Sequence, residues 1–298
     1  MSKRILITGA SGLIGSALSE SLSKNHSVVH LGRTRKPGNT SFVWDVKEKR
    51  VDERALFGVD AVVHLAGASV GEKRWTAAWK KEILDSRVQS TRLLYDTLKK
   101  AASSSVKTFI AASAIGYYGF ESDSVFDEES KSGNDFLAQV TKQWEDEVDK
   151  IKSLGIRVVK IRVGIVLSKN GGALEKMATP IKYGVGSPLG SGKQYLSWIH
   201  LHDLCGIFSK AIEDENLRGA YNATSNWTTN KNMTETIANV LQKPLWLPPV
   251  PGFVLKLILG EMAKIVLNGS KVSSLKIRQA GYHFKYLDLE AALTDLLC

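Results

Sequence analysis

Three glycines near the N-terminus have the spacing of a turn that binds phosphate. Gly9, Gly12 and Gly15 follow an apolar, strand-like segment and open a segment with helical periodicity. In such a turn the first glycine allows a tight bend, the second lets the backbone approach a pyrophosphate, and the third lets the helix pack closely on the strand. The free amides of the helix N-terminus attract the anion. The segment therefore predicts a dinucleotide site, lined by Gly9, Ser11, Gly12, Leu13, Ile14 and Gly15.

Two arginines follow the next predicted strand, where the sequence reads HLGRTRK. A protein specific for NAD places an acid at this point, on the ribose hydroxyls, and no acid occurs here. Arg33 can instead receive a 2′-phosphate through a charge-assisted contact, with Arg35 as a helper. The pattern favours NADP(H) over NAD(H). The alternative is that both arginines are surface charges.

The elements that must position these residues alternate between short apolar runs and longer helical segments. This is the pattern of parallel strands joined by crossover helices, so we predict an α/β fold with a Rossmann-type, doubly wound parallel sheet. The predicted strands are Arg4–Thr8, Ser27–Leu31, Ser41–Trp44, Ala61–Leu65, Lys107–Ala112 and Arg157–Arg162. The clearest helices are Leu13–Lys24, Trp75–Ala101 and Asn134–Leu154.

The pattern changes after Arg162 to a glycine-rich stretch, a strand-like YLSWIHL and a helix for which Asp203 is the expected N-cap. A proline-rich connector then precedes an amphipathic helix over Phe253–Leu267. We predict an NADP-binding Rossmann domain over residues 1–165, to which residues 196–225 return. Residues 166–195 and 226–298 are expected to form a smaller C-terminal substrate lobe.

The composition narrows the class of protein. A chain of 298 residues with 43% hydrophobic residues can bury a large core, and two separated cysteines favour a reducing cytoplasm. The net charge of +10 is scattered, so we expect no nucleic-acid partner, and the longest apolar segment is broken by lysines, so we expect no membrane partner. The six histidines lack metal-ligand spacing, so no metal is expected. The sequence is compatible with an oligomer and does not fix the oligomeric state.

Four motifs together resemble the extended short-chain dehydrogenase/reductases. They are TGASGLIG, HLAGA, SAIGYYG and IRVGIVLS, and the likeness continues through PLGSGKQYLSWIHLHDL to the C-terminus. The chain is most similar to the nucleoside-diphosphate-sugar-epimerase-like members, whose bacterial proteins often carry the label cell division inhibitor. The buried strand VVHLAGA ends in small residues that would line the cofactor site, at Leu65, Ala66 and Gly67.

The same resemblance predicts where catalysis should occur. The wider family carries a Ser or Thr after the fifth strand and Tyr-x-x-x-Lys on the next helix, where the lysine lowers the pKa of the tyrosine. Ser113 is the best match for the serine, although counting back from the end of the motif reaches Ala114. Tyr117 and Tyr118 are the alternative proton donors, because they lie at the end of the strand.

The expected Tyr and Lys pair is missing from its helix, which reads NDFLAQVTKQWEDEV. Phe136 or Leu137 lies near the place of the tyrosine, and Thr141 or Lys142 near that of the lysine. A literal Tyr95-x-x-x-Lys99 precedes the serine, against the family order.

Further positions take their roles from the resemblance. Arg87 stands where the family often has an asparagine facing the active site, and it could hold the pyrophosphate or an acidic substrate. Glu82 either contacts the cofactor or is solvated. The motif IRVGIVLS adds Arg162 and Gly164 as cofactor contacts. Trp198 and His200 are expected in the substrate pocket, His200 equally as a structural histidine.

Two functions are consistent with these residues. The first is an NADP(H)-dependent oxidoreductase or epimerase-like enzyme acting on a small polar substrate, with sugar nucleotides as one class. The second is a non-catalytic NADP(H)-binding regulator or scaffold, which the missing Tyr and Lys pair favours. The first is preferred because the segments expected to line the pocket are as elaborate as in active relatives.

Overall fold

The computed structural model describes residues 2–35, 40–101, 105–120 and 124–298. It contains an eight-stranded sheet in the order β11-β8-β6-β5-β1-β2-β3-β4, parallel except between β3 and β4. The strands are β1 Arg4–Thr8, β2 Ser27–Gly32, β3 Ser41–Asp45, β4 Arg50–Val51, β5 Ala61–His64, β6 Thr108–Ala114, β8 Arg157–Val163 and β11 Gly219–Ala223. From β1 the strand order runs toward one edge of the sheet through β2 and β3, and from β5 it runs toward the other edge through β6 and β8. Ligands bind at such switch points in open α/β sheets.

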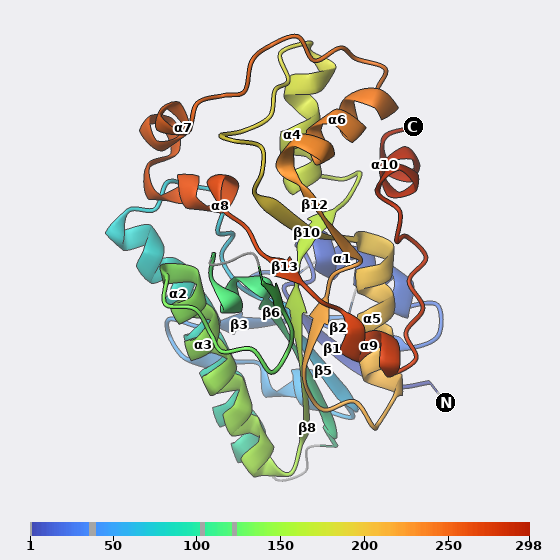
Figure 1. The fold of residues 1–298 in the computed structure, drawn as a ribbon. Helices are drawn as coiled ribbons and strands as arrows, with labels where there is room; N and C mark the ends of the chain where they lie inside the picture. The colour runs from blue at the N-terminus through green and yellow to red at the C-terminus, as the bar shows by residue number, and fades with distance from the viewer. Residues whose placement is uncertain (1, 36–39, 102–104, 121–123) are drawn as a thin grey trace.

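Helices cover both faces of this sheet. Figure 1 shows α2 (Ala77–Lys100) beside α3 (Phe136–Asp149) on one face, and α1 (Leu13–Leu22) with α5 (Leu201–Glu213) on the other. Because both faces are covered, the central strands β1 and β5 are mainly apolar, and β8 is buried at every residue although it carries three cations. Short 3-10 helices follow or link these elements at η1 Glu53–Leu56, η2 Ile115–Tyr118 and η3 Lys150–Leu154. The chain therefore has the predicted Rossmann-type α/β fold.

A second unit is built around a three-stranded sheet, β12-β10-β9. Its strands are β9 Ile165–Leu167, β10 Tyr195–His200 and β12 Asn226–Thr229, and its helices are α4 Ala173–Lys182, α6 Asn230–Val240 and α10 Leu289–Leu297. These elements share a separate apolar core that includes Leu174, Trp198 and Met233. Between α6 and α10 lie α7 Gly252–Leu259, η4 Gly260–Met262, α8 Ala263–Leu267, β13 Lys271–Val272 and α9 Leu275–Gln279, and β13 pairs with β7 Val125–Phe126.

The six predicted strands and three predicted helices all occur, but two expectations about the C-terminal half were wrong. The amphipathic helix expected over Phe253–Leu267 is broken into α7 and α8, because Gly260 takes a φ of +62°. The N-cap of α5 is His200 rather than Asp203: its Nδ1 accepts the N–H of His202. Among the described residues, no helix is both long and apolar enough to cross a membrane.

Candidate functional site

The turn between β1 and α1 leaves no room for side chains at two of its glycines. Gly9 has a φ of +69°, and a Cβ there would lie 2.9 Å from the backbone of Leu65 and Ala66. A Cβ on Gly15 would lie 2.3 Å from the carbonyl oxygen of Gly9. Gly12, by contrast, would meet that oxygen only at 3.4 Å, an ordinary contact. The turn is therefore held close against the end of β5, as a pyrophosphate site at the edge of a sheet requires.

The N-terminus of α1 is open to an anion. Gly12 is the N-cap and supplies no side-chain hydrogen bond, and the first turn of the helix contains no acid. Ser11 and Gly12 are exposed, while Leu13 and Ile14 are half-buried beside them. The positive end of the helix dipole therefore meets no compensating negative side chain within this turn.

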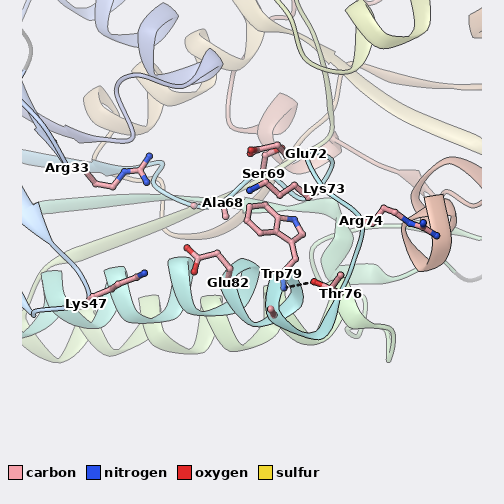
Figure 2. Close-up of a pocket in the computed structure, with 12 residues that line it drawn as sticks. Arg33, Lys47, Ala68, Ser69, Glu72, Lys73, Arg74, Thr76, Trp79 and Glu82 are labelled. Atoms are coloured by element: carbon pink, nitrogen blue, oxygen red, sulfur yellow. Dashed lines mark hydrogen bonds between the residues drawn. The ribbon is translucent and has the colours of Figure 1, made fainter. Parts of the chain in front are cut away.

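A cleft of about 870 Å³ lies beside the end of β5 and the start of α2. Figure 2 shows Arg33 and Lys47 at one end, Glu82 beneath, and Trp79 and Arg74 toward the other end. The complete lining is Arg33, Lys47, Gly67, Ala68, Ser69, Glu72, Lys73, Arg74, Thr76, Ala78, Trp79 and Glu82. Four cationic side chains against two acids give the cleft a positive balance, which suits a phosphorylated ligand.

The two predicted arginines after β2 separate in the structure. Arg33 follows β2 directly and lines the cleft. Arg35 is not among the lining residues, and its guanidinium lies 4.0 Å from the carboxylate of Asp52. Lys47, which no sequence motif identified, occupies the same end of the cleft from the turn after β3. The carboxylate of Asp45 accepts the N–H of Lys47 at 2.9 Å and so shapes that turn.

A buried histidine holds the segment that lines the cleft. The Thr8 hydroxyl lies 2.7 Å from Nδ1 of His64 and accepts the backbone N–H groups of Leu65 and Ala66. Nε2 of His64 lies 3.1 Å from the hydroxyl of Thr91, which itself donates to a backbone carbonyl. These roles assign the proton of the imidazole to Nε2. Burial, with the nearby charge of Arg87, lowers the pKa of His64 to about 3, so the ring is neutral at physiological pH.

Arg87 lies beneath the same segment, next to Gly67. Its guanidinium donates to the carbonyl oxygens of Ala68 (3.0 Å) and Ile83 (2.9 Å) and lies 5.2 Å from the ring of Trp144. No ion pair with a carboxylate is recorded for it among the described residues, and burial lowers its pKa to about 10. An unneutralised cation is thus fixed below the cleft, consistent with the role predicted for Arg87 but not a test of it.

The end of β6 carries a closed polar network, in which buried polar side chains bond to one another and not to solvent. Arg162 forms a two-point ion pair with Glu145, at 2.8 and 2.9 Å, and the Ser113 hydroxyl donates to the same carboxylate at 2.6 Å. Burial opposes ionisation of Glu145, but the bonds and charges of Arg162 and Lys160 outweigh it and hold its pKa below the ordinary value. Ser113 and Arg162 are both 4% exposed, so the structure does not bring Arg162 to the cleft.

Tyr118 belongs to this network as well. Its hydroxyl donates to Asn222 at 2.7 Å and accepts from Arg162 at 3.0 Å, and burial raises its pKa. Tyr117 is half-buried, and the Arg162 guanidinium lies 3.5 Å from the centre of its ring. Of the two predicted proton donors, Tyr117 is the more accessible.

The helix that should carry the Tyr and Lys pair presents other residues to β6. A Cβ on Gly116 would lie 3.4 Å from Cβ of Leu137 and 3.8 Å from the Thr141 hydroxyl, so these two residues, one helical turn apart, face η2, which directly follows β6. The Thr141 hydroxyl bonds to the backbone of its own helix. Neither side chain can exchange a proton near neutral pH as a tyrosine and lysine pair does.

The remaining predicted residues pack inside the second unit. Trp198 is 1% exposed in the core shared by α4 and α6. His200 caps α5, stacks on Tyr286 with ring centroids 4.0 Å apart, and places Nε2 3.3 Å from Asp295. Neither residue lines the cleft. A Cβ on Gly164 would lie 2.7 Å from a carbonyl oxygen of β10, so this glycine serves close strand packing.

Asp203, in the first turn of α5, connects this helix to the C-terminal segment of the chain. It is fully buried, and its carboxylate accepts the backbone N–H groups of Lys285 and Tyr286 and lies 3.2 Å from the hydroxyl of Tyr282. The aspartate that the sequence suggested as a helix cap thus anchors the C-terminal segment.

Comparison with known proteins gives a consistent result over almost the whole chain. The NAD dependent epimerase/dehydratase family matches residues 5–224, and a domain of unknown function (DUF1731) matches residues 250–296. The chain is 36% identical to the chloroplastic epimerase family protein SDR39U1 homolog of Arabidopsis thaliana, over 98% of this chain and 86% of the relative. It is also 36% identical to epimerase family protein SAR0825 of Staphylococcus aureus, over 99% of each chain. The crystal structure of human epimerase family protein SDR39U1 with NADPH aligns with a TM-score of 0.88 and 32% identity, over 98% of each chain.

Proposed function

Because this chain belongs to the NAD dependent epimerase/dehydratase family, we propose that it binds NADP(H) and acts as an oxidoreductase or epimerase-like enzyme. The observation that carries the cofactor choice is the position of Arg33 in the cleft, directly after β2, where no acid follows the strand. A guanidinium there can form a two-point contact with a 2′-phosphate. The similar human protein with NADPH supports the same choice.

The residues of the turn fit a pyrophosphate. The backbone from Ser11 to Ile14 would hold it at the N-terminus of α1, where the missing side chain of Gly12 lets the phosphates approach. Lys47 would be the second cation near the 2′-phosphate, in place of Arg35, which is directed to Asp52. Leu65, Ala66 and Gly67 would lie along the cofactor, held by the Thr8 and His64 hydrogen bonds.

The catalytic part of the proposal is shaped by the closed network. When bound, the nicotinamide ring would supply or accept a hydride. Tyr117 would exchange the proton with the substrate oxygen. Tyr118 is less suited to this role, because its hydroxyl is buried and engaged in two hydrogen bonds, and because burial raises its pKa. Ser113 would act as a positioning residue through Glu145 and Arg162, which hold the end of β6. The substrate class is small and polar, with sugar nucleotides as the first group to test.

A second candidate function has its own observation. Leu137 and Thr141 occupy the face of α3 that opposes η2, directly after β6, so the site lacks the residues that normally exchange the proton. A non-catalytic regulator that senses NADP(H) would need the cofactor site alone. This candidate expects strong stabilisation by NADPH together with no turnover.

Thermal shifts with NADPH, NADP, NADH and NAD test the cofactor choice. The wild-type chain should be stabilised most by the two phosphorylated forms, and Arg33→Ala should remove that preference while it keeps a response to NADH. Arg35→Ala is the matched control and should behave as the wild type. An unchanged preference in Arg33→Ala would refute the assignment.

NADPH absorbance followed across carbonyl and sugar-nucleotide substrates then separates the two candidate functions. Any turnover that Tyr117→Phe abolishes would exclude the non-catalytic regulator.

A further inference from the structure

Apolar side chains gather on one end of the second unit, where they face solvent. We define the apolar end surface as residues 182–185, residues 243–250 and α7. Six of the ten large apolar side chains recorded as exposed belong to it: Tyr183 81%, Val185 55%, Trp246 68%, Phe253 73%, Leu257 77% and Ile258 61%. A concentration of this kind marks an interaction site more often than single exposed apolar residues do.

The connector links the other two segments of this surface. The indole N–H of Trp246 donates to the carbonyl oxygen of Gly184 at 2.8 Å, which joins the connector to the end of α4. The N–H of Val250 donates to Pro188 at 2.9 Å, and Pro251 is the N-cap of α7. Figure 1 shows the connector passing over the end of α4 and continuing to α7, which lies to one side of α4 next to α8, away from the eight-stranded sheet.

The orientation of α7 is unusual for a helix on the surface of a globular protein. Leu255 is buried, whereas Phe253, Leu257 and Ile258 are exposed to solvent. A surface helix ordinarily presents polar residues to water and apolar residues to the core. Here the exposed face carries an aromatic and two branched aliphatic side chains, with Lys256 as its only charge.

The charged side chains within this surface have a single sign. Lys182, Lys243 and Lys256 are exposed, one in each segment, and residues 182–185 and 243–259 contain no Asp or Glu. No ion pair is recorded for these lysines in the described part of the chain. A second copy of the chain docked through this surface by a two-fold axis would bring lysines against lysines, so the charge pattern disfavours self-association.

We propose that the apolar end surface lies on a bilayer that carries anionic headgroups. The aliphatic side chains of α7 would enter the boundary between headgroups and acyl chains, and the lysines would contact lipid phosphates. Tyr183 and Trp246 are the aromatic types that favour this boundary, and the indole N–H of Trp246 already has its partner in Gly184. The chain would lie on the membrane without crossing it, so the proposal revises the expectation of no membrane partner and is independent of the proposed catalysis.

Flotation of the purified chain with vesicles tests the proposal. Vesicles of phosphatidylcholine with about a third phosphatidylglycerol should carry the chain, vesicles of phosphatidylcholine alone should not, and salt should weaken the binding. Since a lysine near an anionic surface contributes about a fivefold change in partition, the triple variant Lys182→Gln, Lys243→Gln, Lys256→Gln should bind on the order of 100-fold more weakly. The double variant Leu257→Ser, Ile258→Ser should also detach.

Matched variants keep the result specific. Phe57 is 83% exposed outside this surface, so Phe57→Ser should bind vesicles as the wild type does. Vesicles should shift the tryptophan emission to shorter wavelength, and Trp246→Phe should reduce that shift while it keeps flotation. All variants should retain the thermal shift with NADPH, which shows that they are folded. Equal binding to neutral vesicles, unchanged binding of the lysine variant, or self-association abolished by the Leu257 and Ile258 changes would overturn the proposal.

Discussion

Two polar regions at the carboxyl edge of the large sheet differ in whether their hydrogen-bonding groups already have partners within the protein. At the turn after β1, helix α1 begins without a side-chain cap, and cations line the cleft nearby. At the end of β6, the polar side chains of Ser113, Glu145 and Arg162 are bonded to one another and removed from water. The first region is therefore prepared for a ligand, whereas the second stabilises the protein. In sequence, the glycine-rich turn matches the family pattern, whereas α3 lacks the Tyr and Lys pair.

The largest expected effect comes from breaking the closed network. Glu145→Ala leaves the Arg162 guanidinium buried without its partner, which should lower the free energy of unfolding by about 3–5 kcal/mol. Denaturant unfolding measures the change. The exposed pair Lys142 and Asp146 on the same helix provides the control, since Asp146→Ala should cost about 0.5 kcal/mol. If Glu145→Ala is as mild as the control, the network does not stabilise the end of β6.

A methyl group at the turn should separate packing from binding. Gly15→Ala places a Cβ against the carbonyl of Gly9, so we expect a loss of about 1–3 kcal/mol in unfolding free energy and loss of NADPH binding. Gly12→Ala meets only an ordinary contact and should keep its stability while it binds NADPH more weakly. Chemical denaturation and NADPH titration of both variants decide the matter; equal stability losses would contradict the geometry.

His64 connects stability to pH. Its pKa is about 3 in the folded chain and near 6.5 when unfolded, so the unfolded state takes up the proton as the pH falls below 6.5. The contribution to folding is complete above that value and diminishes by about 2 kcal/mol at pH 5. Unfolding free energies measured from pH 7.5 to 5 should show this slope, and His64→Gln should reduce it. A slope that survives the substitution belongs to other groups.

The smallest expected effect concerns Lys47. If it assists Arg33 at the 2′-phosphate, Lys47→Ala should weaken NADPH binding about threefold to tenfold and leave NADH binding unchanged. Arg50→Ala, an exposed cation on β4 that does not line the cleft, is the matched control. Isothermal titration at fixed salt distinguishes the two variants, and an equal loss for both would reduce Lys47 to a contribution of general charge.

Much of the fold could be predicted because its signals are local. The apolar runs of the central strands and the three glycines specify the sheet and the turn within short stretches of sequence. Lys160 and Arg162, two of the three cations of β8 and both on one face of it, also indicate that an acid must be buried nearby, but not that it is Glu145. Lys47 and the orientation of α7 depend on contacts between segments far apart in sequence, which no local pattern contains.

The anchoring of the C-terminal segment by Asp203 determines where the chain can be shortened. Cutting after Gly281 would remove the Tyr282 hydroxyl and the Lys285 and Tyr286 N–H groups that bond to this carboxylate, which is fully buried in the intact chain. An affinity tag or fluorescent fusion placed beyond Cys298 keeps these contacts intact. Expression of the Rossmann domain without the C-terminal segment would expose the part of α5 that this segment covers, so we expect the product to be poorly soluble. The C-terminal segment thus packs on the core of the large sheet through Tyr282 and Phe284.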